Sequence, residues 1–260
     1  MTRICVIGNS HLAALKLGWD AIKPEFSGID LTFFGSAGAH IRELTVADGL
    51  LITTDRVLLR SMQDLSGGLS QIDPGCYDRF LVCGMEFSVS QVMRVAAKFR
   101  PESHARDNRH PISDECFRLS VIGCLRESLM IQTVEKLRQI TDKPIAALPT
   151  PMRSDEDQRP VLRHIQTNGD DEKIAAAFTD AARHVATEFN VRLFLQPGDT
   201  LANCLQTKAV YRQGSVRLRA GLNVESAQGD YRHMNKAYGE LVLRSILSGW
   251  DTDGRKLQFA

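Results

Sequence analysis

Short apolar runs alternate with helical patterns along most of this 260-residue chain. The runs are bounded by turn residues, which is typical of buried strands, and the longer stretches between them repeat apolar residues at helical spacing. Strands that alternate with helices favour a parallel sheet with helices on both faces, so the chain is predicted to be an α/β protein. The predicted strands span residues 3–7, 29–34, 80–83, 144–149 and 191–195, and the predicted helices span 10–22, 114–140, 170–189 and 235–247.

The composition is that of an ordinary globular protein, with 43% apolar and 24% charged residues. No composition shift or internal repeat divides the chain, so we predict a single domain over residues 1–260. The formal net charge of +1 gives no bulk attraction for nucleic acid, and no stretch is long and apolar enough to span a membrane. Because the beginning of the chain has no pattern typical of a signal peptide, the cytoplasm is the expected compartment.

The six cysteines are scattered and form no CxxC pair. Neither a zinc site nor a disulfide framework is therefore predicted. No other sequence signal calls for a metal or a cofactor, and we expect none.

Two segments interrupt the alternation of strands and helices. Residues 50–52 and 57–59 are short apolar runs that flank a polar stretch, and we expect a hairpin or edge strands there. Residues 100–114 are polar, charged and irregular. Loops of this length often serve as lids or binding loops, and a solvated surface excursion is an equally good interpretation. We therefore expect a lid or an insertion at about 100–114.

Ser10 lies where the first predicted strand gives way to the first predicted helix. The strand of residues 3–7 ends in Gly8-Asn9, and helical spacing begins after Ser10. A hydroxyl at this position lies near the first free backbone N–H groups of a helix, which favour developing negative charge. A serine there is also a common helix N-cap. Ser10 therefore needs a partner elsewhere in the chain before it becomes a candidate nucleophile.

The candidate partner of Ser10 is His233, near the other end of the chain. A serine nucleophile needs a base within hydrogen-bond reach, and that base needs an acid to orient it. Among the seven histidines, His233 differs because it lies just before the last predicted helix and follows Asp230 by three residues. An Asp-x-x-His sequence is also frequent by chance, as a helix cap beside a solvated histidine. The motifs at the two ends of the chain are together a more specific signal than either motif alone.

Gly-Asn-Ser-His at residues 8–11 and Asp-Tyr-Arg-His at residues 230–233 resemble the motifs of the SGNH hydrolase superfamily, the GDSL-like esterases and lipases. The resemblance spans nearly the whole chain, and its specific motifs lie at the two ends. It implies a three-layer α/β/α sandwich with a central, mostly parallel five-stranded sheet in flavodoxin-like order. It also implies that Ser10 is the nucleophile, His233 the general base and Asp230 the residue that orients the base.

The same resemblance implies an oxyanion hole. In this superfamily it is made by the N–H of the nucleophilic serine, a glycine N–H after the second strand and an asparagine side chain in a Gly-x-Asn motif. By position the glycine is Gly38, and His11, next to the nucleophile, is a further candidate for substrate binding. At the Gly-x-Asn position this chain has Gly84-Met85-Glu86, so Glu86 stands where the asparagine is expected.

Glu86 matters because an ionised carboxylate only accepts hydrogen bonds and would repel an oxyanion. The glutamate could be protonated, turned away from the site or paired with an arginine. Another donor could also replace it, and the weakly patterned loops offer Asn108, Asn203 and Asn223.

The resemblance implies a serine esterase that acts on a small-molecule or carbohydrate ester through a Ser-His-Asp triad. With a sugar hydroxyl in place of water, the same site would be an O-acyltransferase. Because of Glu86, a non-catalytic binding or scaffold protein with this fold is the main alternative. In a third hypothesis, Ser10 and the loop at 35–38 bind a sugar phosphate or a nucleotide, but the usual phosphate-binding signatures are missing.

Overall fold

The computed structural model describes residues 1–104, 107–219, 222–225 and 229–251. Its central strands are β1 (Thr2–Gly8), β2 (Ile29–Gly35), β5 (Arg79–Gly84), β8 (Ile145–Pro149) and β9 (Arg192–Leu193). They form one sheet in the order β2-β1-β5-β8-β9, in which every neighbouring pair is parallel. The predicted sandwich around a five-stranded sheet in flavodoxin-like order is confirmed.

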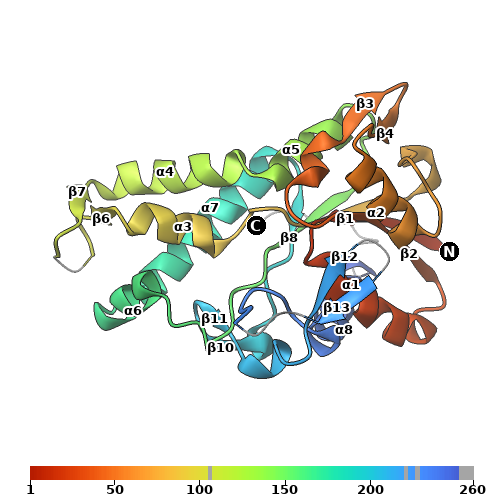
Figure 1. The fold of residues 1–260 in the computed structure, drawn as a ribbon. Helices are drawn as coiled ribbons and strands as arrows, with labels where there is room; N and C mark the ends of the chain where they lie inside the picture. The colour runs from red at the N-terminus through yellow and green to blue at the C-terminus, as the bar shows by residue number, and fades with distance from the viewer. Residues whose placement is uncertain (105–106, 220–221, 226–228, 252–260) are drawn as a thin grey trace.

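Helices cover both faces of this sheet, as Figure 1 shows. One face is covered by α1 (Leu12–Ile22) and α8 (Lys236–Asp251). The helices of the other face are α2 (Arg56–Ser66), α3 (Val89–Ala96), α4 (Asp114–Arg126), α5 (Leu129–Arg138), α6 (Pro160–Thr167) and α7 (Asp171–Glu188).

Strand β1 separates two hydrophobic cores. Its side chains alternate between the faces, as the period of a strand requires. Ile4 and Val6 are buried with α1 and α8, whereas Cys5 and Ile7 are buried with the helices of the opposite face. The apolar run at the start of the chain is therefore continuous because both faces of its strand are covered.

Close packing of α1 against α8 brings the two ends of the chain together. A Cβ atom at Gly239 would lie 1.8 Å from the carbonyl oxygen of Ala14, and one at Gly18 would lie 2.5 Å from the backbone nitrogen of Glu240. Only glycine permits such an approach of two helix backbones. Because Ser10 precedes α1 and His233 precedes α8, this contact also places the N-terminal ends of both segments side by side.

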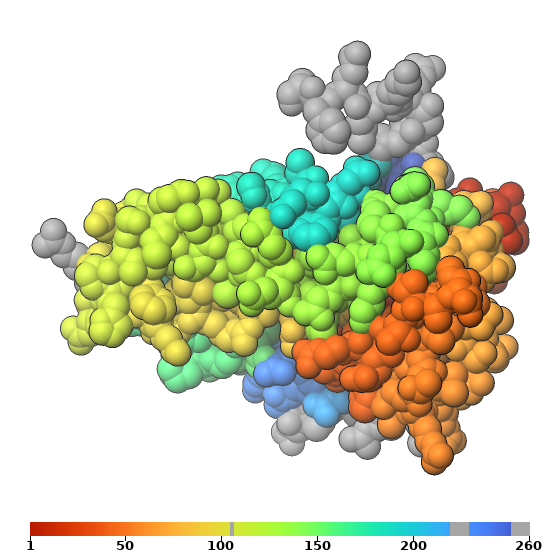
Figure 2. Space-filling model, turned by 90° about the horizontal axis from the view of Figure 1, so that it is seen from above, coloured from red at the N-terminus to blue at the C-terminus, as the bar shows by residue number. Residues whose placement is uncertain are grey.

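The helices α3, α4, α6 and α7 extend beyond the sheet as a projection, visible in Figures 1 and 2. At its tip lie two short parallel strands, β6 (Phe99–Pro101) and β7 (His110–Ile112). The predicted lid or insertion at about 100–114 falls on these strands and on the residues between them, of which 105–106 lie outside the described residues. Its role as a lid stays a prediction, as does the single domain over 1–260.

Three antiparallel pairs complete the strands: β3 (Thr45–Ala47) with β4 (Leu50–Ile52), β10 (Leu201–Asn203) with β11 (Gln206–Thr207), and β12 (Val216–Arg219) with β13 (Leu222–Glu225). Short 3₁₀ turns are η1 (Lys23–Glu25), η2 (His40–Glu43), η3 (Pro74–Cys76), η4 (Gly198–Thr200) and η5 (Ala209–Tyr211).

The hairpin or edge strand predicted at residues 57–59 is wrong, because these residues belong to helix α2. Asp55 caps this helix by accepting the N–H of Leu58 at 2.7 Å, and Leu58 and Met62 are buried one helical turn apart. Three apolar residues in a row resemble a strand, but the cap and the i, i+4 pair decide for a helix.

Two other predicted boundaries also differ. The helix expected over 114–140 is two helices, α4 and α5, because Ser128 starts a new helix by accepting the N–H of Ile131 at 3.4 Å. The strand expected over 191–195 pairs only at Arg192–Leu193.

Candidate active site

Ser10 lies in the turn between β1 and α1, at the carboxyl edge of the sheet. The helix begins at Leu12, two residues later than the predicted start, and the Leu12 N–H bonds to the Asn9 carbonyl at 3.0 Å. A Cβ atom at Gly8 would lie 2.6 Å from the carbonyl oxygen of Cys83, so the strand must end in glycine where β1 passes β5. The N-cap of α1 is His11 and not Ser10, so the Ser10 hydroxyl is placed for a bond to another segment.

That bond goes to His233. The Oγ of Ser10 lies 2.8 Å from Nε2 of His233, and Nδ1 of His233 lies 2.7 Å from Oδ2 of Asp230. The carboxylate only accepts, so the neutral ring donates its Nδ1–H to Asp230 and accepts the Ser10 hydroxyl at Nε2. The structure thus brings together all three residues of the predicted triad, although Ser10 and His233 are 223 positions apart.

Asp230 is held by several donors besides His233. Its Oδ1 accepts the backbone N–H of Arg232 at 3.0 Å, and its Oδ2 accepts Nε of Arg217 at 2.7 Å. Burial alone would raise the pKa of Asp230, but the hydrogen bonds from Arg232, His233 and Arg217 outweigh it and hold the pKa well below its usual range. The carboxylate is therefore ionised at neutral pH, as a group that orients a histidine must be.

Arg217 was not singled out in the sequence. It lies on β12, thirteen positions before Asp230, in a region of weak patterning, and a terminal nitrogen of its guanidinium also approaches Oδ2 of Asp230 at 2.6 Å. The same carboxylate oxygen thus receives both the histidine and the arginine. No local motif indicates this contact, because it depends on how the β12–β13 pair docks beside α1.

His11 was expected to bind substrate, and the structure places its ring against the base. The imidazole rings of His11 and His233 are stacked, with centroids 5.1 Å apart and an interplanar angle of 24°. Burial, together with the nearby charge of His233, lowers the pKa of His11 to about 3. His11 is therefore a neutral ring beside the triad, and the same residue also lines the adjoining cavity.

Glu86 lies at the site, as the resemblance implied. Gly84, Met85 and Glu86 form a run of three positive φ angles of 76°, 50° and 67°, which turns the chain sharply after β5. The Glu86 side chain is exposed and lines the cavity that Asn9 and His11 also line. Within the described part of the chain, its carboxylate pairs with no arginine or lysine.

Gly38 lies in an exposed turn after β2, with a φ of 68°. Strand β2 is the neighbour of β1, and Gly35 pairs with Gly8 in the sheet register. No hydrogen bond between described residues links Gly38 to Ser10, so its part in an oxyanion hole stays a prediction.

Asn9 is a site residue that sequence reasoning missed. Its Oδ1 accepts the N–H of His11 at 3.3 Å and packs against Gly84, where a Cβ atom would lie only 2.5 Å away. The side-chain amide is thereby fixed next to Ser10, and its nitrogen donates to none of the described residues. The signal was present in the sequence, because an amide directly precedes the candidate nucleophile.

The other asparagines proposed as replacement donors lie elsewhere. Asn203 donates to Gln206 at 2.9 Å, and Asn108 lines a different cavity. The side chain of Asn223 lies outside the described residues.

Several solved structures are similar to this chain. The periplasmic domain of the lipopolysaccharide acetyltransferase of Salmonella ser. Paratyphi A is 13% identical, with a TM-score of 0.47 over 96% of this chain and 83% of that chain. A carbohydrate acetylesterase family member from Sinorhizobium meliloti is 10% identical, with a TM-score of 0.42 over 97% and 98% of the two chains. The extracellular lipase of Streptomyces rimosus is 10% identical, with a TM-score of 0.43 over 94% and 99%. No protein-family model and no curated protein sequence matches the chain.

The sheet order, the serine after β1 and the Asp-x-x-His before α8 agree with the family named by the sequence motifs. The chain has a three-layer α/β/α fold with a parallel five-stranded sheet in flavodoxin-like order.

The cavity beside the triad has a volume of about 350 Å³. Asn9 and His11 flank Ser10 on its wall, and Arg232 next to His233 also lines it. Further lining residues are Glu86, Ser88, Ser90, Gln91, Arg94, Thr150, Pro151, Arg153 and Arg159. The cavity next to the nucleophile is thus polar and rich in arginine.

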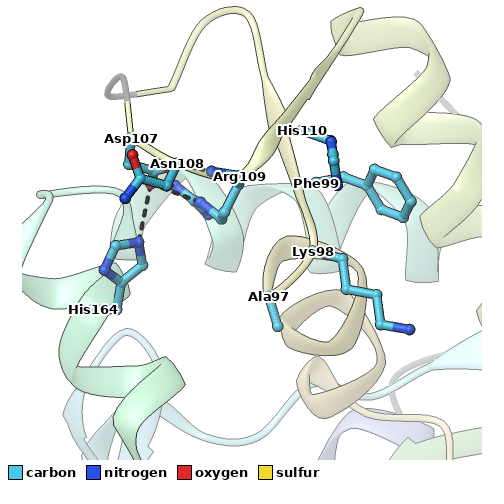
Figure 3. Close-up of a pocket in the computed structure, with 8 residues that line it drawn as sticks. All are labelled: Ala97, Lys98, Phe99, Asp107, Asn108, Arg109, His110 and His164. Carbon is cyan, nitrogen blue, oxygen red and sulfur yellow. Dashed lines mark hydrogen bonds and ion pairs between the residues drawn. The ribbon is translucent and has the colours of Figure 1, made fainter.

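A larger cavity of about 740 Å³ lies in the projection (Figure 3). Three of its side chains bind one another: the Asp107 carboxylate accepts hydrogen bonds from Nε of Arg109 at 2.7 Å and from Nε2 of His164 at 2.9 Å. Arg109 also reaches Asp170 at 3.3 Å. Hydrogen bonds from Arg109 and His164 hold the pKa of Asp107 well below its usual range, despite the opposing effect of burial. This network fastens the chain after residue 106 to α6 and α7, and it holds no nucleophile.

Within the described residues, no helix combines the length and apolarity needed to cross a lipid bilayer.

Proposed function

We propose that this chain is a serine esterase of SGNH type that removes an acyl group from an oxygen of a small molecule or carbohydrate. The single observation that supports the proposal is the hydrogen-bonded series from Ser10 through His233 to Asp230, with distances of 2.8 Å and 2.7 Å. Nucleophile, base and orienting acid in this sequence are the arrangement that activates a serine hydroxyl.

In the proposed reaction, Oγ of Ser10 attacks the ester carbonyl while Nε2 of His233 takes the hydroxyl proton. The imidazolium that forms is stabilised by the ionised Asp230, and its proton then goes to the departing alcohol. Water, activated by His233 in the same way, attacks the acyl-serine and releases the acid. A sugar hydroxyl in place of water would make the enzyme an O-acyltransferase.

The oxyanion needs donors, and Glu86 is not one when ionised. We propose the backbone N–H groups of Ser10 and Gly38 and, in place of the missing asparagine, the amide nitrogen of Asn9. The bond from the His11 N–H to Oδ1 of Asn9 supports this role, because it fixes the amide while leaving its nitrogen free.

A fluorophosphonate probe tests the proposal, because it forms a covalent adduct only with an activated serine. We expect labelling of the wild-type protein on Ser10, no labelling of Ser10→Ala and strongly slowed labelling of His233→Ala. Ser120→Ala is the matched control, since that hydroxyl only bonds to the Cys116 carbonyl on an exposed face of α4, and it should label normally. Hydrolysis of acetyl and butyryl esters should fall by about a thousandfold or more in Ser10→Ala.

Absence of both labelling and ester hydrolysis in the wild-type protein would refute the esterase proposal and favour a non-catalytic binding protein with this fold. Acyl transfer to an added sugar at the expense of hydrolysis would identify an acyltransferase that uses the same triad.

A further inference from the structure

The cavity beside Ser10 is lined by four arginines that come from three segments of the chain. Arg94 lies on α3, Arg153 and Arg159 lie in the segment before α6, and Arg232 lies between Asp230 and His233. The chain as a whole has a net charge of only +1, so this concentration of positive charge is local. It has no part in the triad reaction and calls for its own explanation.

Arg153 and Arg159 are held in place by one buried carboxylate. Both donate through Nε to the same oxygen of Asp157, which is 3% exposed, and the Arg159 bond is 2.6 Å long. Each guanidinium is thereby fixed at its inner edge. The terminal nitrogens are the part of the fork that grips a carboxylate or phosphate in a bidentate manner. Bonding through Nε leaves them available, apart from a long contact of 4.0 Å between one terminal nitrogen of Arg159 and the sulfur of Met93.

Arg94 and Arg232 have exposed side chains and no carboxylate partner among the described residues. Arg94 donates to the amide oxygen of Gln91, whose own nitrogen bonds to the Glu86 carbonyl at 3.0 Å. That contact orients the guanidinium on the cavity wall without neutralising it.

The positive charges in this cavity outnumber the negative ones. Asp157 offsets one of two arginines, and among the described residues that line the wall Glu86 alone carries a carboxylate. Burial and the charges of Arg153 and Arg232 lower the pKa of Arg159 below its ordinary value, against the attraction of Asp157. Arg159 therefore lies close enough to Arg153 and to Arg232 to be repelled by both, and an anion bound beside it would relieve this repulsion.

We propose that this cavity binds an anionic group, a carboxylate or a phosphate, carried by the same acylated carbohydrate whose ester Ser10 attacks. The proposal rests on the esterase function proposed above. The volume of about 350 Å³ suits a group of about the size of one sugar residue. The hydroxyls of Ser88 and Ser90 and the buried Thr150 Oγ1, which has no partner among the described residues, are suited to the hydroxyls of a sugar.

The position of the cavity next to the triad supports the same substrate class. Arg232 adjoins His233, whereas Asn9 and His11 adjoin Ser10, so the anion would lie next to the reacting ester and not at a remote site. Binding there would orient the ester toward Oγ of Ser10, which raises kcat/KM for the anionic substrate.

Three acetylated sugars test the proposal: an O-acetyl methyl glucoside, the matching glucuronoside, and the matching glucoside 6-phosphate. We expect kcat/KM to be at least about tenfold higher for an anionic sugar than for the neutral one, and this advantage to shrink in 0.5 M NaCl. Comparison of the glucuronoside with the glucoside 6-phosphate shows which anion is preferred. In Arg94→Gln/Arg232→Gln the advantage should fall toward one, whereas Arg60→Gln, an exposed arginine of α2 outside the cavity, should retain it.

Equal rates on all three sugars, in a protein that the fluorophosphonate labels, would overturn the anionic-substrate proposal and leave the esterase proposal intact. Calorimetry with methyl glucuronoside and glucose 6-phosphate on Ser10→Ala gives a readout that does not depend on catalysis. Binding that the double arginine variant weakens at least about tenfold supports the anion site. Absence of binding by either anion refutes it.

Discussion

The ring of His11 is neutral and stacked on the ring of His233, which the proposed mechanism charges and discharges in every turnover. Two adjacent imidazolium ions would repel, so the low pKa of about 3 for His11 keeps the stack compatible with a protonated His233. Because folded His11 resists protonation, the free energy of unfolding should depend on pH.

We expect His11→Phe to lose less stability than the wild type on acidification. Below the unfolded pKa of about 6.5, the unfolded chain takes up a proton that folded His11 refuses until about pH 3, so stability is lost as pH falls through this window. For one such group the free energy of unfolding changes by at most about 1.4 kcal/mol per pH unit. Phenylalanine keeps the stacked ring but cannot take up a proton. Urea denaturation at pH 7.0, 5.5 and 4.0 measures this difference.

His184→Gln serves as the control, because this exposed histidine of α7 lies on the protein surface, and its pH curve should follow the wild type. Parallel curves for wild type and His11→Phe would mean that His11 does protonate in the folded state.

Arg217 is expected to set the acid side of the pH–activity profile. Its guanidinium shares Oδ2 of Asp230 with His233, and therefore withholds part of the negative charge that stabilises an imidazolium. In Arg217→Met this charge acts on His233 alone, so the acid limb of kcat/KM should move to higher pH. Arg244→Met, which breaks an exposed ion pair with Glu25, should leave the limb in place. A shift to lower pH in Arg217→Met would contradict this account.

The site residues that could be predicted from the sequence are those that lie within short sequence motifs. Ser10 follows a strand, His233 precedes a helix, and Asp230 is close to it in sequence, so each is recognisable without knowledge of the fold. The sheet order followed from the resemblance that these motifs carry. Glu86 was also found from its position, because the Gly-x-Asn pattern marks the turn after β5.

The missed features depend on contacts between distant segments. Arg217 reaches Asp230 only because the β12–β13 pair docks near α1, and the Asn9 amide is fixed by Gly84 of β5. The arginine cavity gathers residues from positions 94 to 232, and an overall charge of +1 conceals it. Helix α2 was mistaken for strands because three apolar residues do not reveal a period.

Replacement of Glu86 by asparagine should raise turnover on a neutral ester. The change removes a negative charge from the wall of the cavity next to the oxyanion and supplies an amide donor, so kcat should rise by about tenfold or more. The φ of 67° at this position is one that asparagine adopts more readily than glutamate, so the fold should not suffer. Glu86→Gln removes the charge without the preference for positive φ and separates the two effects. With 4-nitrophenyl acetate as substrate, an unchanged or lower kcat in both variants would mean that Glu86 has a role of its own.

The last prediction concerns the contact that fixes Asn9. A Cβ atom at Gly84 would lie 2.5 Å from Oδ1 of Asn9 in a backbone with a φ of 76°. Gly67 is a matched control, because its φ of 79° is nearly the same and nothing lies within 4 Å of its Cβ position. Gly67→Ala should therefore lower the free energy of unfolding by about 1 kcal/mol, the cost of the backbone alone. Gly84→Ala should cost about 1–3 kcal/mol more, because the amide must move.

Activity separates the two glycine variants further. Displacement of Asn9 removes the proposed oxyanion donor, so Gly84→Ala should lose about a hundredfold in kcat on 4-nitrophenyl acetate, whereas Gly67→Ala keeps the wild-type value. Urea denaturation and steady-state kinetics on both proteins measure the two effects side by side. Equal losses of stability and full activity in Gly84→Ala would show that the Asn9 amide moves without cost, and an amide that moves freely is not the fixed donor that an oxyanion hole requires.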